Sequence, residues 1–334
     1  MSERPKKASL AHRLYHGETA INFIGRRRIW FALSGLVILA GVISLLTQGL
    51  NLGIEFKGGT SWEVEAPGVS VAEARDAVRP FGLANATIQV VGGDRIRVAG
   101  GNQPPQEQAE VSRALADLAR VDVTQVSVND VGPTWGQAVT NKARNALVVF
   151  FVLITAYISL RFEWKMAIAA LVAVVHDILV TVGVYSISRF EVTPATVVAF
   201  LTILGYSMYD TIVVFDKVEE NAKGLSATGR LTYSDTVNLS MNQVLMRSLN
   251  TSISSILPII SLLVIGGGIL GATTLNDFGL ALLVGLLTSA YSSLCTASPV
   301  LAILKEREPR YAGVRQRLEA KGGTGVLTPA AAAA

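Results

Sequence analysis

The sequence predicts a membrane protein: an all-α bundle of six transmembrane helices with an α/β domain inserted between the first two. Half of the 334 residues are hydrophobic and only 16% are charged, whereas soluble domains carry about a quarter charged residues. Six apolar stretches are each long enough to cross a bilayer core of about 30 Å, which takes roughly 20 helical residues. The segment 48–136, between the first two stretches, has the mixed composition of a folded domain.

The spans follow from hydropathy and length. Their expected ranges are 28–47, 138–160, 166–188, 195–216, 244–265 and 278–303. The first span follows the basic run 26–28, as a secretory signal would. The apolar run continues to Leu46, however, and no small-x-small cleavage site follows it, so we expect a retained anchor.

The orientation follows from the Lys and Arg residues of the short loops. They collect in the segments 1–27 and 304–334, whereas the loop 189–194 holds only Arg189 and the loop 266–277 holds none. This bias predicts that both termini are cytoplasmic and that the domain 48–136 is extracytoplasmic. The basic clusters suit membrane lipids, and the sequence lacks the basic stripe interleaved with aromatics that would indicate nucleic acid.

The inserted domain shows six short elements. The expected strands are 60–65, 87–91, 95–98 and 121–128, and the expected helices are 71–78 and 106–120. The order βαββαβ is that of the ferredoxin-like motif. Cys295 is the one cysteine, so the chain forms no internal disulfide. A domain of this size is therefore expected to depend for its stability on contacts with a partner or with the membrane. The tail beyond Tyr311 is expected to be disordered.

Three ionisable residues lie within the spans. They are Asp177 in the third, Asp210 in the fourth and Arg247 at the start of the fifth. Such groups cost about 2.5–3.5 kcal/mol near the bilayer centre on insertion scales and are functional candidates. Burial disfavours a charged carboxylate and a nearby guanidinium favours it, so motion of Arg247 relative to Asp210 would couple protonation to conformation. We therefore expect a proton relay.

Structural roles compete with this interpretation. Asp210 could be a carboxyl bonded between helices, and Asp177 could be satisfied by His176 or Thr181. Arg247 could extend to the membrane surface. Three small residues of the sixth span are expected to form a close-packing face rather than a binding site: Gly285, Ser289 and Ser293.

Several motifs carry a resemblance to a known family. The run 53–60, Gly-Ile-Glu-Phe-Lys-Gly-Gly-Thr, resembles the GIDFxGGT signature of the SecD/SecF protein-export subunits, and 131–136 resembles their second signature. His176-Asp177, the run 205–216 and Tyr291-Ser292-Ser293 resemble the SecF branch. The resemblance covers about residues 15–305, so the chain is identified as a member of this family.

The resemblance implies a function. SecF pairs with SecD, and together they resemble a resistance-nodulation-division transporter. The pair assists the Sec channel and uses the proton motive force to help preproteins across the cytoplasmic membrane. The implied partners are SecD, the SecYEG channel, YajC, YidC and the translocating preproteins. Protons are the coupling ion, with no other cofactor, no metal and no enzymatic site. The proton-flow residues of the family map onto Asp210 and Arg247, and a third-span aspartate maps onto Asp177.

The signatures also predict joints where the domain leaves and re-enters the membrane. The expected hinge and signature residues are Gly53, Glu55, Gly58, Gly59, Gly132 and Pro133. The chain departs from the family pattern twice: Glu55 stands where Asp is usual, and Tyr209 where a small polar residue or Asn is familiar.

Three rival functions remain to be weighed. A stand-alone proton-driven exporter of small molecules or lipids usually has two six-span halves in one chain, unlike this sequence. An intramembrane aspartyl protease would need a Gly-x-Gly-Asp motif, which is missing. A scaffold with inert buried charges would keep export activity when Asp210 is replaced by Asn.

Overall fold

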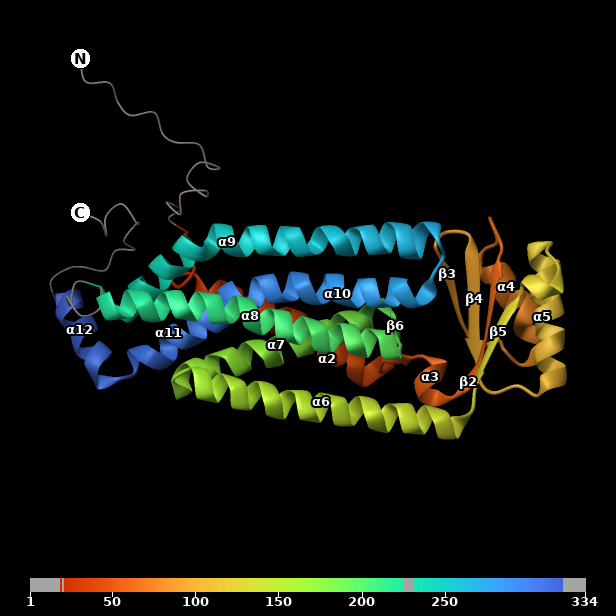
Figure 1. Ribbon diagram of the computed structural model, residues 1–334, viewed down its shortest axis with the longest axis horizontal. Helices are drawn as coiled ribbons and strands as arrows, with labels where there is room; N and C mark the ends of the chain where they lie inside the picture. Colours follow the sequence, from red (N-terminus) through yellow and green to blue (C-terminus); the bar gives the residue numbers. More distant parts are fainter. Residues whose placement is uncertain (1–18, 20, 225–230, 321–334) are drawn as a thin grey trace, which may run out of the picture.

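The computed structural model of the chain describes residues 19, 21–224 and 231–320. Within them, six helices are long and apolar enough to cross a membrane, which confirms the expected number. Their bounds are Arg27–Gln48 (α2), Pro133–Arg161 (α6), Trp164–Ser188 (α7), Pro194–Gly224 (α8), Tyr233–Ser261 (α9, continued by the π-helical η4, Leu262–Ile269) and Thr273–Ser292 (α10, continued by the π-helical η5, Ser293–Ala297, and by α11, Ser298–Glu306). Figure 1 shows them as one elongated bundle.

The helices at one end of the bundle are longer than the apolar stretches. α9 begins at Tyr233 because the Thr232 hydroxyl accepts from the Asp235 backbone N–H while the Asp235 carboxylate accepts from the Thr232 N–H. This capping box starts a helix before its apolar part begins.

The expectation of disorder beyond Tyr311 is wrong as far as residue 320, because α12 spans Pro309–Ala320. The amphipathic stretch considered over 9–24 lies mostly outside the described residues.

Small residues let the first and third transmembrane helices pack closely. A Cβ added at Gly41 of α2 would lie 2.6 Å from the Gly183 Cα of α7. Side chains of α7, α8, α9 and η5 fill the interior of the bundle, and Ala169, Ala173 and Phe215 are fully buried there. The contact between α2 and α7 therefore depends on glycine at both positions.

A separate α/β unit lies at the opposite end of the bundle from α12 (Figure 1). Its elements are β2 (Gly59–Glu65), α4 (Val71–Val78), β3 (Thr87–Val91), β4 (Arg95–Gly100), α5 (Pro105–Ala119) and β5 (Ser127–Val131). The sheet is antiparallel with strand order β3-β4-β2-β5. Trp62, Ile96 and Leu115 fill the core between the sheet and its two helices, which lie on the side away from the bundle.

Two elements of this region differ from the sequence expectation. The strand expected over 121–128 begins only at Ser127, because Asp122 caps a short 3₁₀ turn, Val123–Gln125. A second, two-stranded parallel sheet joins β1 (Asn51–Leu52) to β6 (Glu191–Val192). It ties the segment after α2 to the connection between α7 and α8, with the short helix α3 (Ile54–Lys57) directly after it.

Candidate functional site

Asp210 lies on α8 inside the bundle and is only 7% exposed. Two serine hydroxyls hold its carboxylate. Ser248 of α9 donates to Oδ1 at 3.0 Å, and Ser293 of η5 donates to Oδ2 at 2.5 Å. Three segments far apart in sequence therefore meet at one titratable group. Hydroxyl donors stabilise a carboxylate and can rotate to accept from its protonated form, so the arrangement suits either protonation state.

Ser293 reaches Asp210 from a break in the sixth transmembrane segment. The chain changes from α- to π-helical at Ser293, and the Ser298 hydroxyl donates to the Ser293 carbonyl at 3.0 Å. Single π-helical turns are frequent at functional sites. The expectation of a close-packing face holds for Gly285, where a Cβ would lie 2.3 Å from Ile203. Ser293 is also fully buried, but its hydroxyl has in addition a polar role as a partner of Asp210, which the packing prediction did not include.

Asp177 lies on α7 and is 1% exposed. The Ser207 hydroxyl of α8 donates to its Oδ2 at 2.5 Å, and His176 Nδ1 lies 3.2 Å from its Oδ1. The other ring nitrogen of His176 lies 3.0 Å from the hydroxyl of Ser34 on α2, which in turn lies 3.1 Å from the Tyr291 hydroxyl. The histidine and Ser207 therefore satisfy the carboxylate that sequence reasoning assigned to either a relay or a structural role.

The two buried carboxylates are linked through α8, which carries both Asp210 and Ser207, the donor to Asp177, but they do not contact one another. Ser207 and Asp210 are three residues apart and so lie on the same side of the helix. Ser207 bonds to α7, whereas Asp210 bonds to α9 and η5. Any rotation of α8 would change both sets of bonds.

Arg247 is exposed on α9, and its Nη2 donates to the Tyr209 hydroxyl at 3.5 Å. Within the described part of the chain it makes no ion pair with Asp210. The neighbouring Ser248 makes the contact instead. The guanidinium thus lies on an outward polar face of α8 and α9, where Ser255 also donates to the Tyr206 hydroxyl at 3.0 Å.

The predicted joints differ in how much they need glycine. Gly58 and Gly59 have φ values of 79° and 144°, and a Cβ at Gly59 would lie 2.3 Å from the Gly100 carbonyl oxygen. Gly53 has an ordinary φ, but a Cβ there would lie 2.4 Å from Glu55 Oε2. Gly132 has φ −64° and open space around it, so the turn before Pro133 does not require glycine.

The acidic and histidine side chains offer no metal site among the residues that the structure describes. No group of three or more His, Cys, Asp or Glu side chains is arranged to hold a metal ion in residues 19, 21–224 and 231–320.

Comparison with protein families places these features in context. Residues 110–307 match the family model described as protein export membrane protein SecD/SecF, C-terminal, and residues 43–66 match the SecD/SecF GG motif. The chain is 40% identical to protein translocase subunit SecF of Streptomyces coelicolor over 321 residues, covering 96% of this chain and 86% of that protein. It is also 40% identical to protein translocase subunit SecF of Mycobacterium tuberculosis, covering 90% and 70% of the two chains.

A solved structure shares the fold. SecDF from Thermus thermophilus, described as a translocon-associated membrane protein, superimposes with a TM-score of 0.77 at 33% identity over 87% of this chain. A second structure, SecDF in a super-membrane-facing form, gives a TM-score of 0.59 at 29% identity. The chain spans 39% and 40% of the lengths of those two proteins.

Proposed function

The chain belongs to the SecD/SecF family as a SecF-type subunit of the protein-export machinery, and we propose that it couples proton movement through Asp210 to preprotein translocation. Membership accounts for the multi-pass membrane architecture. The proton motive force supplies about 2.3 kcal/mol for each charge that crosses 100 mV. That free energy is enough to bias a bundle between two arrangements.

One observation carries this proposal: a buried aspartate whose hydrogen bonds come from two other segments. Ser248 and Ser293 both donate to Asp210. Each such bond to a charged group contributes about 1.5–3 kcal/mol, and the bonds must rearrange when the carboxylate gains a proton. Protonation thereby alters the contacts among α8, α9 and η5. Arg247, beside Ser248, would enter the site in the alternate arrangement and displace the proton.

The external unit fits the role of a ferredoxin-like extracytoplasmic domain. Its elements follow in the order β2, α4, β3, β4, α5, β5, and its strand order is β3-β4-β2-β5. Basic residues of the helix connections support the sidedness. Arg161, at the end of α6, pairs with Asp216, and Lys165, at the start of α7, pairs with Glu308. Figure 1 shows these ends of α6 and α7 on the side of the bundle opposite the sheet. Under the positive-inside rule that end is cytoplasmic, so both termini are proposed to be cytoplasmic.

The outward polar face of α8 and α9 suits a membrane partner. Tyr209 is 53% exposed and Arg247 is exposed on the same face. Such groups are costly against lipid, and a second six-helix subunit would cover them. The names of the related proteins make SecD the proposed occupant. The SecYEG channel, YajC and YidC are proposed as further partners in the same assembly.

A reconstitution experiment tests this function. The chain, a SecD subunit and the SecYEG channel are placed in proteoliposomes with a preprotein, and translocation is measured with and without an imposed proton gradient. We expect the gradient to raise translocation only when both subunits are present. An equal rate with and without the gradient would contradict the proposal.

A stand-alone proton-driven exporter of small molecules or lipids is the alternative function. It would be favoured if the purified chain alone carried dyes or lipids across vesicles in response to a proton gradient. We expect no such flux without SecD, because Arg247 is left exposed on the single chain. Copurification of SecD and the Sec channel with the tagged chain is the direct control.

A further inference from the structure

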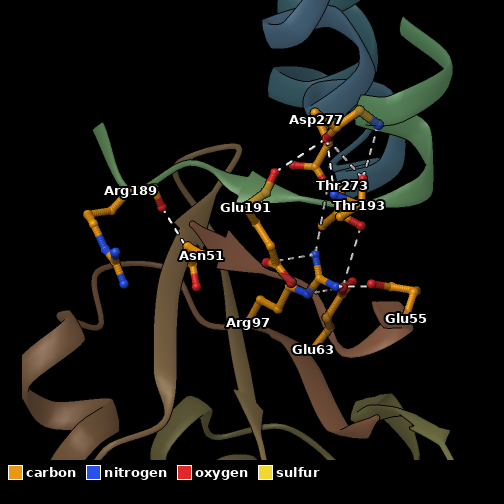
Figure 2. Close-up of polar contacts among 10 residues, drawn as sticks. Asn51, Glu55, Glu63, Arg97, Arg189, Glu191, Thr193, Thr273 and Asp277 are labelled. Atoms are coloured by element: carbon orange, nitrogen blue, oxygen red, sulfur yellow. Dashed lines mark hydrogen bonds and ion pairs between the residues drawn. The ribbon is translucent and has the colours of Figure 1, made fainter. Parts of the chain in front are cut away.

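A second charged cluster lies outside the bundle, around Arg97 (Figure 2). The guanidinium of this residue of β4 is surrounded by four carboxylates, although its side chain is only 7% exposed. The ion-pair distances from its nitrogens are 3.4 Å to Glu63, 3.7 Å to Glu55, 3.4 Å to Glu191 and 4.0 Å to Asp277. Of these residues, sequence reasoning singled out only Glu55, because polar residues of the external domain and its connections resemble ordinary surface charges.

The cluster joins the external domain to the bundle. Arg97 and Glu63 come from its sheet, whereas Glu191 comes from β6 and Asp277 from α10. Neighbouring contacts reinforce the junction. Arg95 Nη1 donates to the Gly271 carbonyl at 2.9 Å, and the Thr273 hydroxyl donates to Glu63 Oε1 at 3.4 Å. The charge state of the cluster therefore bears on how firmly the domain is held.

The charges of the cluster do not balance. Four carboxylates face one guanidinium, and Glu191 is 3% exposed at its side chain while Asp277 is 13% exposed. Burying an uncompensated carboxylate is unfavourable, so such a group tends to take up a proton instead. A metal cation is a poor alternative here, because Arg97 occupies the centre of the cluster.

Two carboxylate oxygens in the cluster have unused hydrogen-bonding capacity. Glu55 Oε2 and Glu191 Oε2 are both buried without a hydrogen-bond partner. The backbone brings the two side chains together, since Gly53 N–H donates to the Val192 carbonyl at 2.9 Å. A Cβ at Gly53 would lie 2.4 Å from Glu55 Oε2 and 3.0 Å from Glu191 Oε1. Both carboxyl groups therefore lie against Gly53, and each has one oxygen that a bound proton could supply with a hydrogen bond.

Water has access to this junction. A cavity of about 550 Å³ lies between the external domain and the bundle, lined by β3, the end of α7 and the start of α10. Glu191 and Asp277 both form part of its wall. Protons can therefore reach the cluster from outside the membrane without passing through the bundle.

We propose that the Arg97 cluster is a second proton-binding site, in which Glu191 holds a proton next to Glu55 and Asp277, and that the bound proton keeps the external domain docked on the bundle. The site is separate from Asp210. Asp277 and Ser293, the partner of Asp210, lie along the same helical segment, about 24 Å apart at 1.5 Å per residue. Docking of the external domain on the bundle can therefore be measured in the absence of preprotein translocation.

The electrostatics of Glu191 give the sign of the effect. Burial raises the pKa of Glu191; Arg97 opposes this rise, Glu55 and Glu63 add to it, and Lys57 opposes it. The docked state thus holds its proton more tightly than a solvated glutamate would. Docking is therefore fully stabilised at low pH and loses that stabilisation as the pH rises through the raised pKa.

Other charged groups near Glu191 are engaged elsewhere. Arg189 donates to the Gln48 carbonyl at 3.0 Å, and Arg75 donates to the Ala84 carbonyl at 2.7 Å. Asp277 faces the same guanidinium. Neither arginine forms an ion pair with Glu191 within the described residues, so the excess of negative charge remains.

A distance measurement between the two parts tests the proposal. The single buried cysteine, Cys295, is replaced by Ser. Spin labels are then attached through Glu107→Cys on α5 and Val198→Cys on α8, both exposed positions. Double electron–electron resonance on the full chain in lipid nanodiscs is recorded from mildly acid to mildly alkaline pH. We expect a short distance between the labels at acid pH. As the pH rises, a second population with a longer distance should increase at the expense of the first.

The expected change in the ratio of the two populations is up to about tenfold for each pH unit, the limit for one bound proton. Glu191→Gln, which mimics the protonated side chain, is expected to keep the short distance at every pH. Asp277→Asn serves as a second variant with a smaller pH response. Glu65→Gln is the matched control on the same strand as Glu63, because Glu65 is exposed and outside the cluster; it is expected to behave like the parent.

Two results would overturn the proposal. One is a distance distribution in the parent chain that does not change over the pH range. The other is an unaltered pH response in both Glu191→Gln and Asp277→Asn.

Discussion

The hydroxyl of Ser293 donates to Asp210 Oδ2 at 2.5 Å and joins the middle of α8 to the π-helical break of the sixth transmembrane segment. Ser293 is fully buried, and Asp210 nearly so. If Asp210 Oδ2 were protonated, the Ser293 hydroxyl could no longer donate to it and would have to rotate to accept a hydrogen bond. The bond therefore links the titratable group to a π-helical break in the sixth transmembrane segment.

Replacing Ser293 by Ala is expected to lower proton-driven translocation, because Asp210 loses one of its two hydroxyl donors. Loss of a hydrogen bond to a charged group costs about 1.5–3 kcal/mol. Ser289→Ala is the matched control, since Ser289 is equally buried on the same segment but its hydroxyl has no hydrogen-bond partner. The rates are compared in proteoliposomes with SecD and SecYEG; equal loss in both variants would argue against a specific role.

Glycine at position 41 is expected to be required for the contact between α2 and α7. Gly41→Ala should destabilise the protein by about 1–3 kcal/mol, the usual cost of overpacking, because the Cβ would lie 2.6 Å from backbone of Gly183. Gly35→Ala on the same helix meets nothing within 4 Å and should be neutral or stabilising by up to about 1 kcal/mol. Thermal unfolding in detergent measures both. Similar melting temperatures for the two variants would contradict this packing.

The two joints of the external domain are expected to respond differently to alanine. Gly59→Ala should destabilise by at least about 1–3 kcal/mol, since its φ is 144° and its Cβ would meet the Gly100 carbonyl. Gly132→Ala should have little effect, because that residue has φ −64° and free space. Thermal unfolding again provides the comparison, and a larger loss for Gly132→Ala would refute the assignment.

The end of the bundle opposite the external domain should show an acid-sensitive ion pair. Burial favours a raised pKa at Glu308, but the hydrogen bond from Lys165 and the charge of Lys305 outweigh it and lower the pKa. The pair therefore stabilises the fold above the usual carboxyl range and is lost as the pH falls through the lowered pKa. We expect Glu308→Gln to lower the melting temperature at neutral pH and to match the parent in strong acid.

The exposed pair Lys217–Glu220 supplies the control for that experiment. Glu220 is 69% exposed at its side chain, and such surface pairs contribute about 0–1 kcal/mol. Glu220→Gln should thus leave the melting temperature nearly unchanged. A drop as large as that of Glu308→Gln would show that the effect is not specific to the partly buried pair.

The transmembrane part of the fold was predictable because hydropathy is a local signal. The six apolar stretches and the helix at Val71–Val78 could be identified without tertiary information. The polar start of α9 at Tyr233 was missed because it lies outside the apolar stretch. The pairing of β1 with β6 was missed because each strand has only two residues and they lie far apart in sequence.

The candidate site was predictable only in part. A carboxylate within an apolar run singles out Asp210 directly, but a serine such as Ser293 is common in close helix packing and gives no local sign of a polar role. Arg97 resembles a surface charge on an alternating strand, and only the tertiary fold brings Glu191 and Asp277 against it. Sequence patterns identify costly groups, whereas their partners depend on long-range contacts.

The most direct test of the central claim replaces Asp210 by Asn in the chain reconstituted with SecD and SecYEG. Asparagine keeps the size and a hydrogen-bond acceptor for Ser248 and Ser293 but cannot exchange a proton at neutral pH. The measured quantity is the increase in preprotein translocation caused by an imposed proton gradient, with Asp216→Asn, at a partly exposed position further along α8, as control. We predict that the increase disappears in Asp210→Asn and persists in Asp216→Asn; an undiminished increase in Asp210→Asn would contradict a proton-carrying role and leave Asp210 as a structural residue.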